Sequence, residues 1–312
     1  MDEVHVVLGA SGGWGSAIAY ELVRQGKTVR GTSRSGKANV PAEVEMRVLD
    51  IHNRDQLREV LQGAVQVYHC VNVPYSKWAK ELPAITGNIL SVIEELGIPL
   101  LITDNLYMYP EDASEPLSED MPWASTGKKG NIRAMIAKTY MDAHNTGRIE
   151  MAIVRAPDFF GPRVGMNSYY SERIFGEALK GKNTSVMGNP DMLHQIAFAP
   201  DLARASIMVA EDPEAYGQIW HLPSDTAITQ REFVQKVYQR VGMEAKVGSI
   251  GKMMIRVGGL FNREIREVGE MMYEFNKPYL VSHKKFMGRY DFKITPLDDA
   301  IDQTMEWFRQ IA

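Results

Sequence analysis

The stretch that decides the fold reads Val4-His5-Val6-Val7-Leu8-Gly9-Ala10-Ser11-Gly12-Gly13-Trp14-Gly15. An apolar run enters a turn with glycines at positions 9, 12 and 15, and a helix is predicted over residues 16–24. This order of strand, glycine turn and helix is the context that a dinucleotide-binding turn needs. The glycines allow a close approach of the backbone, and the helix N-terminus offers free N–H groups to a pyrophosphate. A sharp strand-to-helix turn without a ligand is the alternative.

Strand-like and helix-like segments alternate through the first half of the chain. Hydrophobic periodicity predicts strands over 27–32, 44–49, 64–71, 99–103 and 150–155, and helices over 53–61, 82–96 and 130–145. Strands separated by helices form a parallel sheet, and ligands bind beyond the carboxyl ends of its strands. The predicted fold class is therefore α/β, a Rossmann-like doubly wound parallel sheet with a smaller C-terminal substrate lobe.

The character of the chain changes beyond residue 165. We predict a dinucleotide-binding domain over 1–165, completed by about 197–228, and a substrate-binding lobe from 166–196 and 229–312. A strand is predicted over 218–222, and helices over 171–180, from 199, over 229–241 and over 297–310. Residues 252–287 are rich in methionine and aromatic residues, which fits either an adaptable apolar pocket or ordinary core packing.

Composition excludes several classes of protein. The formal net charge of -4 gives no sign of a polyanion-binding protein, so nucleic acid is not an expected partner. The single cysteine, Cys70, excludes an internal disulfide and suits a reducing compartment. No apolar run reaches the ~20 residues of a membrane span, and Asp2 and Glu3 give an acidic start. We expect a cytoplasmic protein with a small-molecule substrate, no membrane partner and no metal, and leave open whether it is a homodimer.

Several motifs resemble the extended short-chain dehydrogenase/reductases of the NAD-dependent epimerase/dehydratase type. Beside the glycine turn, the segment 160–162 reads Phe-Gly-Pro where that family shows Tyr-Gly-Pro, and 199–203 is near its Val-Asp-Asp-Val-Ala pattern. Thr295-Pro296-Leu297 and Trp307 match its final helix. The resemblance covers nearly the whole chain. It implies that the N-terminal domain holds NAD or NADP and that the C-terminal lobe binds substrate.

The end of the second predicted strand bears on the choice of cofactor. An acidic residue about 20 positions after the glycine turn would bind the adenosine ribose and exclude a 2′-phosphate. Here Ser33 and Arg34 occupy that place, and the next carboxylate is Glu43. Arg34 offers a fork of donors to a phosphate, Ser33 a hydroxyl and Lys37 a further positive charge. We therefore expect NADP rather than NAD, with a solvated basic loop as the alternative.

The expected cofactor contacts combine the glycine turn with the ends of the following strands. Asp50 and Ile51, at the end of the third predicted strand, resemble the adenine-contacting pair of the family. The full expected set is Gly9, Ser11, Gly12, Gly13, Trp14, Gly15, Ser33, Arg34, Asp50, Ile51, Val71, Asn72, Arg133 and Pro157.

The catalytic motif departs from the family pattern. The resemblance implies Tyr-x-x-x-Lys at the start of the helix after the fifth strand, where the lysine lowers the pKa of the tyrosine that exchanges a proton with substrate. Of the thirteen tyrosines only Tyr273 has a lysine four residues on, Lys277, and it lies far along the chain. The aligned helix carries Lys129 at the tyrosine position and Arg133 at the lysine position. Arg133 could still hold ribose hydroxyls; two basic residues decorating a helix start are the alternative.

The loop after the fifth predicted strand supplies other candidates. It reads Thr103-Asp104-Asn105-Leu106-Tyr107-Met108-Tyr109-Pro110, where the resemblance implies a catalytic serine near Thr103 or Asn105. We predict Tyr107 as the proton donor, supported by Lys129 or Arg133, with Asn105 beside the substrate carbonyl. Packing of both tyrosines against the adjacent helix is the alternative.

The expected substrate contacts complete the site. They are Tyr75, Tyr109, Asp158, Phe160 and His194. Asp158 serves equally well as a turn cap, and a lone histidine is more often bonded within the protein. The predicted function is an NADP-dependent oxidoreductase, or an epimerase/dehydratase-type enzyme, acting on a small carbonyl compound by hydride transfer. The alternative is an NADP-binding sensor similar to the NmrA-like regulators.

Overall fold

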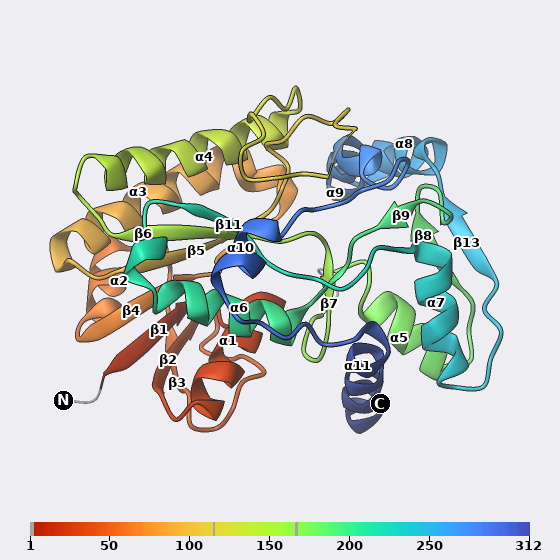
Figure 1. The fold of residues 1–312 in the computed structure, drawn as a ribbon, viewed down its shortest axis with the longest axis horizontal. Helices are drawn as coiled ribbons and strands as arrows, with labels where there is room; N and C mark the ends of the chain where they lie inside the picture. Colours follow the sequence, from red (N-terminus) through yellow and green to blue (C-terminus); the bar gives the residue numbers. More distant parts are fainter. Residues whose placement is uncertain (1–2, 115, 166–167) are drawn as a thin grey trace.

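A seven-stranded parallel sheet forms the centre of the N-terminal half (Figure 1). Its order is β11-β6-β5-β4-β1-β2-β3, and every neighbouring pair is parallel. This computed structural model describes residues 3–114, 116–165 and 168–312, so Asp2 of the acidic start lies outside the described residues. The strands are β1 Val4–Leu8, β2 Thr28–Ser33, β3 Glu45–Val48, β4 Ala64–His69, β5 Leu100–Asp104, β6 Met151–Arg155 and β11 Ile219–His221.

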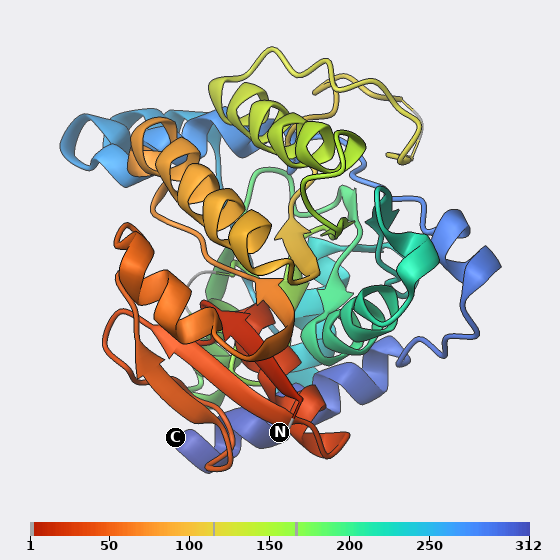
Figure 2. The same cartoon turned by 90° about the vertical axis from the view of Figure 1, so that its left-hand side faces the viewer.

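Helices cover both faces of this sheet, and Figure 2 shows the two layers from the side. Because side chains alternate along a strand, Val7 packs on one face while Val6 and Leu8 pack on the other. The Val7 face holds α1 Gly13–Arg24 and α6 Ala199–Ala210. The opposite face holds α2 Arg54–Leu61, α3 Trp78–Leu96 and α4 Lys128–Asn145. The predicted Rossmann-like fold class is confirmed.

Some helices begin where the local sequence predicts, and another begins where a tertiary contact fixes its first turn. Asn53 caps α2, and Thr229 forms the predicted capping box with Glu232 at the start of α7 Gln230–Gln239. In contrast, α3 begins four residues before the predicted position, ahead of Pro83. The cause is Trp78, which is buried and donates its indole N–H to the Val73 carbonyl, and so anchors an extra first turn.

The C-terminal lobe has its own aromatic core, centred on Phe160, Phe175, Phe233 and Phe308. Its strands form the pairs β10–β7, β12–β9 and β13–β8. They are β7 Phe159–Phe160, β8 Thr184–Met187, β9 Leu193–His194, β10 Ala197–Phe198, β12 Ile228–Thr229 and β13 Val247–Ile250. The helices are α5 Glu172–Leu179, α7, α8 Lys252–Phe261, α9 Arg263–Val268, α10 Lys284–Arg289 and α11 Leu297–Ile311, with 3-10 turns η1 Tyr75–Lys77, η2 Pro213–Ala215 and η3 Gly269–Tyr273.

One segment of the predicted lobe packs elsewhere. Phe286 and Phe292, around α10, join the core cluster that contains Trp220 and the apolar side of α6. Residues 284–294 therefore return to the sheet of the dinucleotide-binding half. Among the helices of the described residues, none is long and apolar enough to cross a membrane.

Candidate active site

The glycine turn between β1 and α1 has the geometry of an anion cradle. Gly9 has φ +84°, and a side chain there would lie 2.9 Å from the Cys70 carbonyl oxygen. A side chain at Gly15 would collide with the Gly9 carbonyl oxygen. At Gly12 the nearest atom to an added Cβ is the Gly9 oxygen at 3.4 Å, an ordinary contact distance. Gly9 and Gly15 therefore shape the turn, while Gly12 leaves the N-terminus of α1 open to a pyrophosphate.

The other residues of the turn contribute through their backbone. Trp14 is buried, and its indole Nε1 donates to Ser206 Oγ at 3.1 Å, so its side chain ties α1 to α6. An added Cβ at Gly13 would meet Val164 at 3.1 Å. The side chain of Trp14 is thus directed into the protein, so its predicted contact with the cofactor would be made by its backbone, whereas Ser11 is exposed.

Beyond β2, the chain turns through Ser33–Gly36, and Gly36 has φ +70°. Arg34 and Lys37 are exposed there. Ser33 is buried and donates its hydroxyl hydrogen to the Lys37 carbonyl at 2.8 Å. In this conformation Ser33 cannot donate to a phosphate, so only the two basic side chains of the predicted phosphate-binding set are free to do so.

The remaining predicted cofactor contacts lie at the carboxyl ends of β3, β4 and β6. Asp50 is exposed, and its Oδ1 accepts the His52 backbone N–H. Ile51 is half-buried, and its carbonyl accepts from Asn88. Val71 donates its backbone N–H to His69 Nδ1. Pro157 is buried, two residues after the end of β6.

Tyr107 and Tyr75 form a pair at the carboxyl edge of the sheet. Their hydroxyl oxygens are 2.7 Å apart, so one hydroxyl donates to the other. Burial raises the pKa of Tyr107 well above its ordinary value, and the neighbouring Tyr75, Glu274 and Asp158 raise it further. Burial likewise raises the pKa of Tyr75. Both phenols are therefore neutral near pH 7 and able to donate a proton.

Lys129 does not act as a free cation beside this pair. Its Nζ lies 2.7 Å from Glu267 Oε2 and 3.1 Å from Glu270 Oε2, and its side chain is buried. Its backbone N–H also donates to Glu270 Oε1 at 2.7 Å. Although Nζ is 5.4 Å from the centre of the Tyr75 ring, two carboxylates neutralise its charge. The prediction that Lys129 supports the proton donor is therefore not favoured by its surroundings.

Arg133 links the end of β5 to the predicted ribose site. Its Nη2 donates to Asn72 Oδ1 at 3.1 Å, and its Nη1 is 3.4 Å from Asp104 Oδ1. The guanidinium stacks on Trp78, with its carbon 4.2 Å from the ring centre. This places Arg133, in the second turn of α4, beside Asn72, which follows β4, as the prediction of a shared cofactor site requires.

A buried polar chain below the site was missed by the sequence analysis. It runs along the ends of β5, β6 and β11, where Asp104 and His221 both pair in register with Arg155. Arg155 Nε is 3.2 Å from Asp104 Oδ2, and Arg155 Nη1 donates to the Tyr109 hydroxyl at 2.9 Å. The signal was present, because each of three neighbouring strands ends in a polar residue.

Tyr109 is part of this buried hydrogen-bonded network and does not lie on an exposed surface that could bind substrate. Its hydroxyl lies 2.7 Å from His221 Nε2. Because Arg155 can only donate, the Tyr109 oxygen accepts from it and gives its own hydrogen to His221. His221 is thus a neutral acceptor, and burial, assisted by Arg155, lowers its pKa to about 3.

Two buried histidines, His221 and His69, predict that the stability of the fold decreases at acidic pH. Burial also lowers the pKa of His69 to about 3, and its Nδ1 accepts the Val71 N–H. In the unfolded chain both titrate near ~6.5, so below that pH the unfolded state binds protons that the folded state refuses. We expect each histidine to lower the free energy of unfolding by about 2 kcal/mol at about pH 5.

Urea unfolding at a series of pH values measures this effect. Stability should fall as pH drops below ~6.5, and His221→Gln should remove about half of that dependence. An identical pH dependence in the variant would show that His221 is protonated in the folded protein.

Asp158 and His194 join the sheet to the lobe. His194 Nε2 is 3.0 Å from Asp158 Oδ2, and the imidazole stacks on Phe275 and Tyr279 at ring distances of 5.3 Å each. His194 is buried, so its contact with substrate would pass through Asp158, which stays half-buried. Burial, with the charge of Asp158, raises the pKa of the neighbouring Glu274 well above its ordinary value.

Two predicted residues, Phe160 and Asn105, are engaged in contacts within the protein. Phe160 is buried in the lobe core between Phe175 and Phe233, and this packing is at odds with a substrate contact. Asn105 Oδ1 accepts the backbone N–H of Tyr107 at 3.2 Å, so it shapes the turn that presents Tyr107.

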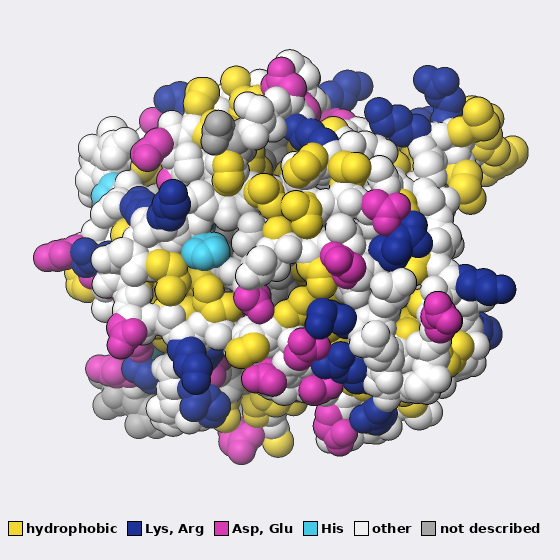
Figure 3. Space-filling model, turned by 45° about the vertical axis from the view of Figure 1, so that its right-hand side comes forward, with side chains coloured by type: hydrophobic (Ala, Val, Ile, Leu, Met, Phe, Trp, Pro, Cys, Tyr) yellow, Lys and Arg dark blue, Asp and Glu magenta, His cyan; other side chains and the backbone are white. Residues whose placement is uncertain are grey.

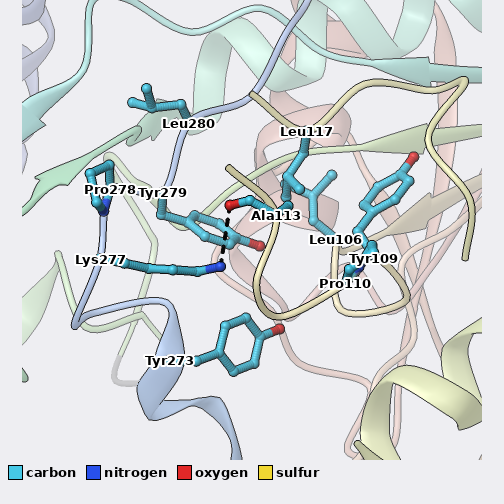
Figure 4. A pocket seen from close by; sticks show the side chains of 10 residues that line it. All are labelled: Leu106, Tyr109, Pro110, Ala113, Leu117, Tyr273, Lys277, Pro278, Tyr279 and Leu280. Carbon is cyan, nitrogen blue, oxygen red and sulfur yellow. Dashed lines mark hydrogen bonds between the residues drawn. The ribbon is translucent and has the colours of Figure 1, made fainter. Parts of the chain in front are cut away.

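A small pocket adjoins the loop after β5 (Figure 4). Tyr273 and Lys277, the pair with the Tyr-x-x-x-Lys spacing, line it together with Tyr109. Lys277 Nζ donates across the pocket to the carbonyl oxygens of Glu111 and Ala113. The pair that is remote in sequence therefore faces the loop carrying Tyr107.

Comparison with known proteins identifies one matching family and several solved structures with the same fold. Residues 5–222 match the family described as the NAD dependent epimerase/dehydratase family. The chain is 22% identical to cinnamoyl-CoA reductase 1 of Oryza sativa subsp. japonica over 290 residues, which covers 84% of each protein. It superposes on UDP-glucuronic acid 4-epimerase from Bacillus cereus, in complex with NAD, with a TM-score of 0.79, 15% identity and 99% of each chain covered.

A second solved structure agrees. It is dTDP-glucose 4,6-dehydratase from Bacillus anthracis str. Ames, in complex with NAD, with a TM-score of 0.79 and 13% identity over 99% of this chain and 97% of that one. At such identities the structural likeness shows the fold, and the family match covers more than half of the chain. The protein belongs to the NAD dependent epimerase/dehydratase family.

Proposed function

We propose that this chain is an NADP(H)-dependent reductase of a small carbonyl compound, with Tyr107 as the proton donor. The observation that carries the proposal is the Tyr75–Tyr107 hydroxyl pair, 2.7 Å apart at the carboxyl edge of the sheet. Ligands of doubly wound sheets bind at this edge. Reduction of a carbonyl requires a protonated acid, and both phenols are held neutral by burial.

Each residue of the site has a distinct part in this reaction. The turn at Gly12 and the side chains of Arg133 and Asn72 would hold the dinucleotide, whose reduced nicotinamide supplies a hydride when bound. Tyr107 would give its proton to the substrate oxygen as negative charge develops there. The Tyr75 hydroxyl would donate a hydrogen bond to the Tyr107 phenolate until a proton from solvent restores the phenol. The rice relative, by its name a reductase, supports this direction of reaction.

The surroundings of Lys129, which stands at the tyrosine position of the family motif, also support reduction as the direction of the reaction. A lysine that lowers the pKa of a tyrosine lets the phenolate take a proton from an alcohol. Here two glutamates bind Lys129, and burial raises the pKa of Tyr107 instead. Tyr107 is therefore held in the protonated form that reduction of a carbonyl requires, and not in the phenolate form that would take a proton from an alcohol.

A panel of small aldehydes, ketones and enones tests the proposal by the loss of NADPH absorbance. We expect the wild type to oxidise NADPH with at least one of them and Tyr107→Phe to lose that activity. If calorimetry shows NADPH binding while every class of carbonyl compound is inert, the sensor alternative is favoured.

The choice of NADP rests on Arg34. The solved relatives above carry NAD, but Arg34 and Lys37 are exposed beyond β2 of this chain, and Glu43 is the first carboxylate after them. A charge-assisted fork from Arg34 to the 2′-phosphate would favour NADP. We expect Arg34→Asp to weaken NADPH binding by roughly tenfold or more and to spare NADH.

Calorimetric titration with both cofactors measures the two affinities, and Arg24→Asp is the control. Arg24 is an exposed arginine at the far end of α1 that bonds to Glu21. Equal affinities for the two cofactors in the wild type would contradict the preference, whatever the variants do.

A further inference from the structure

We propose that helix α8 docks this chain onto an anionic lipid membrane surface. The contact is made by the α8 apolar face, defined as the side chains of Met253, Met254, Val257, Leu260 and Phe261. Their exposed fractions are 79%, 60%, 53%, 77% and 87%. Figure 3 shows this group in yellow at the upper right edge of the molecule, with dark blue basic side chains beside it. Large apolar side chains gathered at such exposure mark an interaction surface.

The α8 apolar face is one side of a helix. Positions 253, 254, 257, 260 and 261 follow the spacing that puts residues on one side at 3.6 residues per turn. The opposite side carries Ile255 and Gly259, which are buried. A surface helix normally turns its apolar side to the core. Here five large apolar side chains face outward.

The hairpin of α8 and α9 holds this face outward. An added Cβ at Gly259 would lie 2.9 Å from the Arg266 Cα, and one at Gly258 would lie 3.2 Å from Ile265. The two helices are therefore packed closely through glycines. On its other side the hairpin is bound to the body, because Glu267 pairs with Lys129. The α8 apolar face cannot turn inward without breaking these contacts.

The charges around this face identify the partner. The α8–α9 hairpin, residues 252–268, holds two anions, Glu264 and Glu267, and Glu267 is paired with Lys129. Its four cations are Lys252, Arg256, Arg263 and Arg266, whereas the whole chain has a net charge of -4. All four cations are exposed. Anionic lipid head groups attract such clusters, each cation near the surface adding to the affinity. A local basic cluster around an apolar face on an acidic protein is complementary to an anionic membrane.

The dimensions of α8 fit a helix that lies on the membrane. Ten residues extend about 15 Å, half of the ~30 Å hydrocarbon core. A helix with bulky apolar residues on one side and basic residues beside them lies in the interfacial plane, with its apolar side among the acyl chains. The sequence-based expectation of no membrane partner considered only the length of apolar runs, which does not detect such helices.

Vesicle flotation with the full chain tests the proposal. Vesicles of phosphatidylcholine alone are compared with vesicles that also contain phosphatidylglycerol. We expect flotation with the anionic vesicles, weakening as salt rises. The double variant Leu260→Ser/Phe261→Ser should bind at least about tenfold more weakly, because two large apolar side chains no longer enter the lipid. Arg256→Gln should weaken binding about fivefold.

Ile311→Ser is the matched control, since Ile311 is 58% exposed on α11, far from α8 (Figure 1); it should float like the wild type. Thermal melting checks the fold, and if the double variant melts early, Phe261→Ser alone carries the test. Failure of the wild type to float overturns the proposal, and so does flotation of Leu260→Ser/Phe261→Ser, or of Phe261→Ser where it replaces the double variant, that equals flotation of the wild type. A change of mass by light scattering without vesicle binding would identify a second copy as the occupant and also overturn it.

Discussion

Replacing Tyr107 by phenylalanine is expected to lower the turnover number for carbonyl reduction by roughly 10²–10⁴-fold, the usual size of a general-acid contribution. The ring stays in place, because Tyr107 stacks with Trp78 at a ring distance of 6.0 Å and phenylalanine can keep that contact. Only the hydroxyl, 2.7 Å from that of Tyr75, is lost. Steady-state kinetics with a compound from the carbonyl panel, and calorimetry with NADPH, separate turnover from cofactor affinity, which should not change.

The pH dependence of the rate gives a second readout of the same residue. An acid must be protonated to act, and burial raises the pKa of Tyr107 above its ordinary value. A raised pKa moves the loss of the acid form to higher pH. We therefore expect no loss of rate from ionisation of this group up to the ordinary tyrosine value near ~10. A limb of the pH–rate profile between neutrality and that value would assign the proton to another group.

Two further tyrosines make the Tyr107 result decisive. Tyr109→Phe removes the hydroxyl that bridges Arg155 and His221, so we expect a loss of stability of about 1–3 kcal/mol with turnover within a few fold of the wild type. Tyr273→Phe probes the pair with Lys277 that lines the neighbouring pocket. Full activity of Tyr107→Phe together with a loss in Tyr273→Phe would move the acid to that pair.

The fold could be predicted because its determinants are local and repeated. The turn after β1 requires glycine at positions 9 and 15 for steric reasons, and this requirement is visible in the sequence as a glycine pattern. Buried parallel strands are visible as nearly continuous apolar runs. Predicted strands of the sheet agree with the structure within two residues. The pairs of the lobe could not be found in the same way, since β7 and β10 have only two residues each and therefore no period to detect.

The residues of the candidate site also differ in how far they could be predicted, because some are placed by regular elements and others by partners distant in the sequence. Arg133 and Asn72 are at the ends of regular elements, so aligning the elements brought them together. The role of Lys129 could not be read locally, because its partners Glu267 and Glu270 lie 138 and 141 residues along the chain. Asp104 and Arg155 were accessible in principle: a buried acid and base that end adjacent parallel strands must either pair or remain costly unpaired charges.

Replacing Gly12 by valine is expected to lower the affinity for NADPH and NADH alike by at least about 100-fold, because the side chain would occupy the space where a pyrophosphate approaches the start of α1. The folded chain tolerates the change. Gly12 has φ -81° and ψ 158°, an extended conformation open to valine, and an added Cβ meets only the Gly9 oxygen at 3.4 Å. Calorimetry measures the affinities, and the melting temperature should stay near that of the wild type.

Gly251→Val is the matched control for this change. Gly251 is the N-cap of α8 with φ -81° and ψ 169°, and nothing lies within 4 Å of an added Cβ. The same substitution in the same backbone conformation, but at a helix start outside the predicted cofactor site, should leave both affinities unchanged. Gly15→Ala differs from both, since its methyl group collides with the Gly9 carbonyl oxygen and should lower the melting temperature. If Gly12→Val binds both cofactors as tightly as Gly251→Val, the glycine turn serves the packing of β1 on α1, and the dinucleotide must bind elsewhere.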